Sequence, residues 1–214
     1  MIRLLTAALL LMLCNGTAQA QTPAVTGHLT PDLHAQSIVI FQKDLNTEFA
    51  NPKESPLTEA ERRAFSTLPY YPTNYNYYVT AKLVRDSTAQ PFAMETSTAQ
   101  RPLYRKYGEL CFILNGQALR LSIYQNQELL NKPGLEDYLF VPFTDLTNGK
   151  GKGSYGGGRY LDLRVPPAGT STMELDFNRA YNPSCAYNHG YSCPVPPAEN
   201  QLAAGIPAGV RSDR

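Results

Sequence analysis

Near the N-terminal end of the chain, apolar residues recur at intervals of three and four positions. They place one apolar face on a predicted helix over residues 37–50, formed by Ile38, Phe41, Leu45 and Phe49. Asn51-Pro52 ends this helix. Thr58 and Glu61 have the spacing of a capping box, which predicts a second, short helix that runs to about residue 67.

From Tyr75 onward the apolar pattern changes to a period of two, which is typical of strands. The first predicted strand places Tyr75, Tyr77, Val79, Ala81 and Leu83 on one face. Asn115-Gly116 separates the apolar stretches 109–114 and 118–124, and this dipeptide is a strong signal for a type I′ hairpin.

Three further strands are predicted over residues 138–143, 160–165 and 172–177. The loop 166–171 is short enough to join the last two as a hairpin. After Asn178 regular structure should stop, because prolines cannot join a central ladder; they stand at positions 183, 194, 196, 197 and 207.

These elements predict an α+β fold that is mainly β. Two N-terminal helices precede seven to eight strands, arranged as an antiparallel sandwich or a partly open barrel, and a Pro-rich C-terminal segment wraps around it. The length is sufficient for one domain with a single core, which we place at residues 35–214. The polar segment 21–34 contains two prolines and is predicted to be flexible.

Residues 1–20 have the three parts of a secretory signal peptide. Arg3 supplies the basic start, residues 4–13 form a short apolar run, and Ala18-Gln19-Ala20 is a small-x-small cleavage site. We therefore expect cleavage after Ala20 and a periplasmic or extracellular protein. The alternative is a lipoprotein anchored through Cys14, although Leu13 is a poor residue to precede that cut.

The net charge of the chain limits the kinds of binding partner that we expect. The whole chain has a formal net charge of +1, and loss of Arg3 on cleavage leaves a mature chain with equal numbers of basic and acidic residues. No basic patch stands out, which argues against nucleic acid and anionic membranes as partners. No segment after the signal is apolar enough to cross a membrane.

Polar residues are concentrated among glycines and prolines between residues 153 and 200. We expect a candidate binding pocket here, made by the Gly156–Gly158 loop, a polar strand face and the following turn. Its residues are Gly156, Gly157, Gly158, Arg159, Asp162, Asp176, Asn178, Arg179 and Asn182. Buried polar groups must be paired, so the alternative interpretation is a scaffold of structural ion pairs.

Catalytic motifs are absent from the sequence: there is no G-x-S-x-G and no H-E-x-x-H. Asp162 and Asp176 could act as a general base in a hydrolase, with an arginine stabilising the developing charge. His28 and His34 fall in the segment that we predict to be flexible. We therefore favour binding of a small molecule, glycan or protein partner without catalysis, and keep a hydrolase or a purely structural protein as alternatives.

Cys185 and Cys193 lie in the Pro-rich tail, where a disulfide in an oxidising compartment would replace missing regular structure. We predict that bridge. Together with His189 these cysteines also have the ligand types for zinc, but the spacing is unusual and a fourth ligand is not evident, so no cofactor is predicted.

The sequence resembles the bacterial family known as domain of unknown function 1684. The resemblance runs from about residue 36 to residue 210 and rests on several short stretches. These are 55–57, 101–109, 124–128, 141–149, 153–163, 176–185 and 193–200. The family has no assigned activity, so the resemblance implies no site residues; Cys111 and His189 are departures from its pattern.

Overall fold

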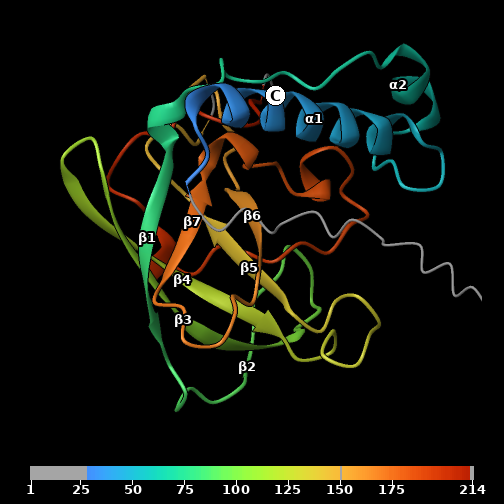
Figure 1. The fold of residues 1–214 in the computed structure, drawn as a ribbon. Coiled ribbons are helices and arrows are strands. Elements are labelled where there is room, and N and C mark those ends of the chain that lie inside the picture. Colours follow the sequence, from blue (N-terminus) through green and yellow to red (C-terminus); the bar gives the residue numbers. More distant parts are fainter. Residues whose placement is uncertain (1–27, 150, 213–214) are drawn as a thin grey trace, which may run out of the picture.

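The structure, a computed structural model, describes residues 28–149 and 151–212. The predicted signal peptide therefore lies outside the described residues. The fold is mainly β, as predicted: seven antiparallel strands form a curled half-barrel, and a long helix lies across one end of it (Figure 1).

That long helix, α1 (Pro31–Ala50), begins six residues before the predicted start. Thr30 is its N-cap and accepts a hydrogen bond from the Leu33 amide, Pro31 occupies the first turn, and Asp32 places a negative charge there. All three favour a helix start. The prediction of a flexible segment over 21–34 was therefore wrong for residues 31–34, and residues 21–27 lie outside the described part.

The capping box at Thr58 is confirmed. The Thr58 amide donates to Glu61 Oε2 (3.0 Å), and the Glu61 amide donates to Thr58 Oγ1 (3.3 Å). The helix that it starts, α2 (Glu59–Ala64), ends three residues before the predicted end.

The sheet has the strand order β6-β5-β4-β3-β1-β7, and β2 pairs with β3. The strands are β1 (Tyr78–Arg85), β2 (Phe92–Ala93), β3 (Leu103–Leu114), β4 (Gln117–Asn126), β5 (Tyr138–Phe143), β6 (Arg159–Arg164) and β7 (Thr172–Asp176). The hairpin at Asn115-Gly116 is confirmed, with positive φ angles of 50° and 78°. Residues 75–77, predicted as strand, form a 3-10 turn, η1 (Tyr75–Tyr77).

The predicted hairpin between the last two strands was wrong. β6 pairs with β5 and β7 pairs with β1, so two strands that are consecutive in sequence lie at the two edges of the sheet. The ends of the connecting loop explain the separation. Val165 donates its amide to Asp137 O (2.7 Å) beside β5, whereas Ser171 O accepts from the Leu83 amide (2.8 Å) of β1. The half-barrel therefore remains open along β6 and β7, and we call this gap the seam.

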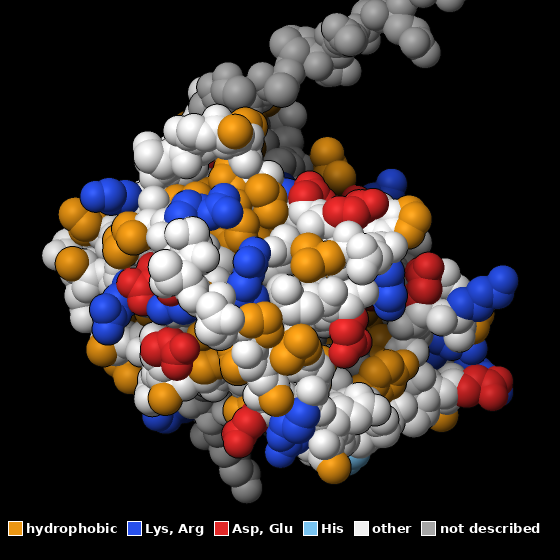
Figure 2. All heavy atoms as spheres, turned by 90° about the horizontal axis from the view of Figure 1, so that it is seen from below, with side chains coloured by type: hydrophobic (Ala, Val, Ile, Leu, Met, Phe, Trp, Pro, Cys, Tyr) orange, Lys and Arg blue, Asp and Glu red, His pale blue; other side chains and the backbone are white. Residues whose placement is uncertain are grey.

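The sheet is buried on both faces. Its inner face forms the main core, with fully buried residues such as Leu110, Leu121, Leu139 and Leu175. Its outer face carries a second, aromatic cluster covered by the C-terminal tail, made of Met94, Tyr104, Tyr124, Phe140, Tyr160, Cys185 and Cys193. On the side of the molecule away from α1, acidic and basic side chains are interspersed (Figure 2).

The C-terminal segment wraps around the sheet as predicted. It contains three 3-10 turns, η2 (Phe177–Arg179), η3 (Ser184–Ala186) and η4 (Ala198–Asn200). Asn200 is fully buried and bridges two strands: its amide group exchanges hydrogen bonds with the Ser122 backbone of β4 (2.7 and 2.9 Å) and donates to Pro142 O of β5 (2.7 Å). Only one paired position joins β4 to β5, so this side chain replaces missing ladder bonds.

Arg159, a residue of the predicted pocket, instead helps to hold the C-terminal segment against the sheet. Its side chain is 0% exposed and forms an ion pair with Asp145 (2.7 Å). It also donates to the backbone carbonyls of Ile206 (2.8 Å) and Ala208. A buried guanidinium paired in this way holds the tail against β6 and is closed to ligands.

We expect Arg159→Ala to lower the free energy of unfolding by about 3–5 kcal/mol, because it leaves Asp145 buried without its counter-ion. The matched control is Arg164→Ala on the same strand, whose ion pair with Asp137 is more than half exposed on both sides and should cost at most about 1 kcal/mol. Urea unfolding of both variants measures the difference. Equal losses would contradict a structural role for Arg159.

Candidate functional site

The open seam carries a cleft. It has a volume of about 230 Å³ and lies between Leu161, Asp162 and Leu163 of β6 and Glu174 and Asp176 of β7. Leu29, Ser37, Tyr78 and Arg179 complete its lining. We call it the seam cleft; a neighbouring, more open hollow of about 720 Å³ continues along the same two strands past Thr170 and Thr172.

Asp162 is the central acidic group of this region. Tyr138 and Tyr181 both donate their hydroxyls to its Oδ1, at 2.7 and 2.8 Å. The side chain reaches solvent, yet desolvation by the surrounding protein raises the pKa of the Asp162 carboxyl, while the two tyrosine hydrogen bonds and Arg164 oppose this rise. Among the described residues, Oδ2 has no hydrogen-bond partner and is available to a ligand.

A second hollow also has Asp162 in its lining. This helix groove, of about 280 Å³, lies beneath α1 and is lined by Asp44 and Glu48 of the helix together with Asp162, Tyr181 and Asn182. Desolvation and the nearby charges of Glu54 and Asp162 raise the pKa of Glu48. Carboxylates therefore face the groove from both the helix and the sheet.

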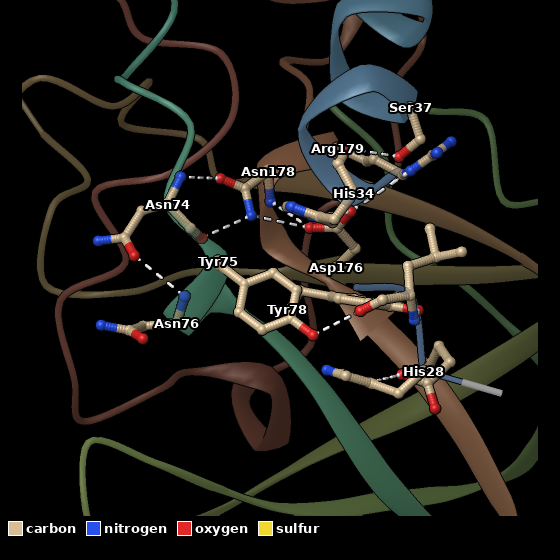
Figure 3. Close-up of polar contacts among 12 residues, drawn as sticks. His28, His34, Ser37, Asn74, Tyr75, Asn76, Tyr78, Asp176, Asn178 and Arg179 are labelled. Carbon is tan, nitrogen blue, oxygen red and sulfur yellow. Dashed lines mark hydrogen bonds and ion pairs between the residues drawn. The ribbon is translucent and has the colours of Figure 1, made fainter. Parts of the chain in front are cut away.

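Asp176, by contrast, is surrounded by protein donors (Figure 3). Its Oδ1 accepts from the backbone amide (3.0 Å) and side-chain amide (2.9 Å) of Asn178, and its Oδ2 lies 3.0 Å from His34 Nε2 and 3.5 Å from Arg179 Nε. Such a carboxylate has little capacity left for a ligand. It ties α1 to the end of β7.

His34 was missed by the sequence reasoning because it was assigned to a flexible segment. It is 1% exposed and lies one turn before Ile38 on the buried face of α1. The signal that could have found it is Thr30-Pro31-Asp32, an N-cap residue followed by proline and an acid. A helix that starts there must place His34 over the sheet.

The residues just before α1 also belong to the seam. His28 Nδ1 lies 2.5 Å from Glu174 Oε2, and its ring stacks on Tyr78 with centroids 4.1 Å apart. The ring of His34 stacks on Tyr78 as well, at 4.8 Å. Leu29 is held by the Tyr75 hydroxyl, which donates to its carbonyl (2.5 Å). This segment forms one wall of the seam cleft.

The predicted pocket is thus only partly assembled. The structure brings Asp162, Asp176 and Arg179 together in the seam cleft and places Asn182 in the helix groove. Asn178 is a scaffold residue: it accepts from the Asn74 amide (2.8 Å) and donates to the Asn74 carbonyl (2.9 Å).

The triple glycine lies elsewhere. Gly158 has a φ of 93°, and a Cβ at this position would come within 2.6 Å of Pro196 Cγ and 2.7 Å of Phe143 O, so the close approach is to the protein itself. Gly156 and Gly157 do not line the seam cleft or the helix groove.

The tail cysteines are neighbours but are not bonded to each other. Both are free thiols, and the Cys185 amide donates to Cys193 Sγ at 3.1 Å. Burial, helped by a hydrogen bond with Cys185, raises the pKa of the Cys193 thiol to about 12. The predicted disulfide is therefore not supported by the structure. Within the described residues no three His, Cys, Asp or Glu side chains are arranged to hold a metal ion.

The comparisons with known proteins agree with the fold. The family model "Protein of unknown function (DUF1684)" matches residues 63–211. The chain belongs to this family. A solution NMR structure of an uncharacterised protein from Haloarcula marismortui is 32% identical, covers 85% of this chain and 96% of its own length, and superposes with a TM-score of 0.65. Curated proteins give no match.

The description of the DUF1684 family assigns it no function. The family model begins at residue 63, so α1 and its His34 lie before the matched region. Across residues 28–149 and 151–212, none of the helices has the length and apolar character that a membrane-spanning helix requires.

We expect Tyr138→Phe to raise the pKa of Asp162 further, because it removes a hydrogen bond that stabilises the ionised carboxyl. The pKa is measured from the pH dependence of the NMR chemical shift of the Asp162 carboxyl carbon. Tyr191→Phe, whose hydroxyl does not bond to Asp162, is the matched control. A pKa that stays unchanged or falls in Tyr138→Phe would contradict the geometry described above.

Proposed function

We propose that this protein is an exported, non-catalytic binding protein that holds a small, positively charged ligand around Asp162. The observation that carries this proposal is the free Oδ2 of Asp162 at the junction of the seam cleft and the helix groove. A carboxylate whose other oxygen is already oriented by two tyrosines is a pre-organised acceptor for a charged donor.

The surrounding charges favour a cation. Asp44 and Glu48 face the helix groove, while Glu174, which lines the seam cleft, is paired with His28. Arg179, which lines the seam cleft, is paired with Asp176, and Arg164 is paired with Asp137. The remaining field is negative, and an amine would lower the repulsion among these carboxylates.

Stability does not require an ionised group at this position. Desolvation raises the pKa of Asp162 above its usual value. The contribution of this carboxyl to stability is therefore fully present below the pKa of the unfolded chain, and it is lost as pH rises through the higher pKa of the folded protein. Folding thus favours the protonated form. A carboxylate kept where stability does not require its charge is typical of a functional site.

A hydrolase is the second candidate, because a raised carboxyl pKa suits a general base. Asp176 does not meet that requirement, since four protein contacts occupy it. Asp162 could accept a proton, but the groups that face it across the helix groove are carboxylates, which would destabilise a developing oxyanion. We therefore favour binding.

The ligand half of the proposal is tested with simple amines. We expect 1,4-diaminobutane to raise the melting temperature of the wild-type protein, and glucose and acetate to leave it unchanged. Asp162→Asn should abolish the shift, whereas Asp137→Asn, which removes an exposed carboxylate of the Arg164 pair, should keep it. The proposal would be contradicted if 1,4-diaminobutane raised the melting temperature of Asp162→Asn as much as that of the wild type. It would also be contradicted if 1,4-diaminobutane did not raise the melting temperature of the wild type.

Export is supported by residues 1–20 alone, with their basic start, apolar run and small-x-small site. The mass of the protein recovered from the periplasm or medium tests it. We expect a chain that begins at Gln21. A chain that retains residues 1–20, or one that begins with a lipid-modified Cys14, would contradict soluble export.

A further inference from the structure

A fourth hollow lies on the outer face of the sheet, beside the two that meet at Asp162. It has a volume of about 340 Å³ and is walled by six aromatic rings: Tyr104, Tyr138, Phe140, Tyr160, Tyr181 and Tyr191. Leu129 and Leu135 add apolar side chains, and no Lys, Arg, Asp or Glu lines it. We call it the tyrosine cleft; it shares no lining residue with the seam cleft.

The rings are steeply inclined to each other rather than coplanar. Phe140 and Tyr160 meet at 75° with centroids 4.7 Å apart, and Tyr160 and Tyr181 meet at 90° with centroids 5.8 Å apart. Tyr104 is tilted by 40° against Phe140. Rings at such angles form no flat platform parallel to a sugar ring.

Three of the five tyrosines that line the cleft already use their hydroxyls within the protein. Tyr138 and Tyr181 donate to Asp162 Oδ1, and Tyr160 donates to Pro194 O (2.5 Å). Desolvation raises the pKa of all three phenols above the ordinary value, so they remain neutral. A ligand beside these three rings therefore meets no free hydroxyl donor from them, which disfavours a polyhydroxylated ligand.

The charge behind the rings is negative. Two of the rings end on the Asp162 carboxylate, at 2.7 and 2.8 Å from their hydroxyl oxygens. Donation to an anion polarises a phenol and increases the electron density of its ring. The faces of aromatic rings attract cations, and desolvated aromatic enclosures recognise quaternary ammonium groups.

We propose that the tyrosine cleft binds an alkylated ammonium ion, such as a trimethylammonium group, through its ring faces and the Asp162 carboxylate behind them. The methyl groups of such an ion match Leu129 and Leu135 at the rim, and its charge cannot be neutralised by giving up a proton. The tyrosine cleft shares Tyr181 and Ser184 with the helix groove, but its ligand would meet ring faces and not Asp162 Oδ2, so this proposal stands even if the amine site is empty.

The probe is choline, with 3,3-dimethylbutan-1-ol as its neutral isostere, each titrated into the full mature chain by isothermal calorimetry. We expect choline to bind at least about tenfold more tightly than the isostere, because the cation–π contribution is absent in the neutral compound. Equal affinities, or tighter binding of methyl glucoside than of choline, would overturn the proposal.

Three variants locate the bound ion. Tyr191 is 40% exposed, so Tyr191→Ala should fold normally and weaken choline binding at least about fivefold. Phe92→Ala, an exposed aromatic outside the cleft, should leave binding unchanged. Glu48→Gln changes only the helix groove. If Glu48→Gln abolishes choline binding and Tyr191→Ala does not, the ion lies in the helix groove, which overturns the present inference and supports the proposed function.

Discussion

The arrangement of the molecule depends on one constraint: β6 and β7 follow each other in the chain but lie at the two edges of the sheet. β6 pairs with β5 at one edge, and β7 pairs with β1 at the other. An unpaired sheet edge exposes backbone groups and must be covered. Here α1 lies over the end of the seam (Figure 1). The clefts beside Asp162 follow from this incomplete closure.

Polar residues in the last third of the chain divide into two groups with different roles. Arg159, Asn178 and Asn200 are buried and bonded to backbone carbonyls or amides, so they replace the regular ladder that a Pro-rich tail cannot form. Asp162 differs because it keeps one oxygen free and its charge is opposed by desolvation. Scaffold and candidate site are therefore interleaved along the same strand, with Arg159 facing the core and Asp162 facing outward.

Local signals in the sequence predicted local structure well. Asn115-Gly116 and the Thr58 capping box act within a few residues, and both turned out as predicted. The strand period also indicated that Asp162 alternates with the apolar residues of its strand, and this side chain is exposed, because alternation depends only on neighbours. Thr30-Pro31-Asp32 was a readable signal of the same kind, and overlooking it hid His34 from the sequence analysis.

Long-range placement could not be predicted from these patterns. A short loop between two strands favours a hairpin, and only the bonds of its ends to β5 and β1 show why β6 and β7 separate. Likewise, Tyr138 and Tyr181 meet Asp162 from positions 24 and 19 residues away, and nothing in the spacing indicates that their hydroxyls converge on one oxygen. Sequence reasoning thus located the carboxylate but not the groups that define its chemistry.

A crystal structure of the protein purified from its own cells, without denaturation and without added amines, tests the central claim most directly. Our account predicts non-protein electron density within hydrogen-bond distance of Asp162 Oδ2, in the seam cleft or the helix groove. Density for water alone, or a cleft closed by the neighbouring side chains with Oδ2 bonded to protein, would contradict it.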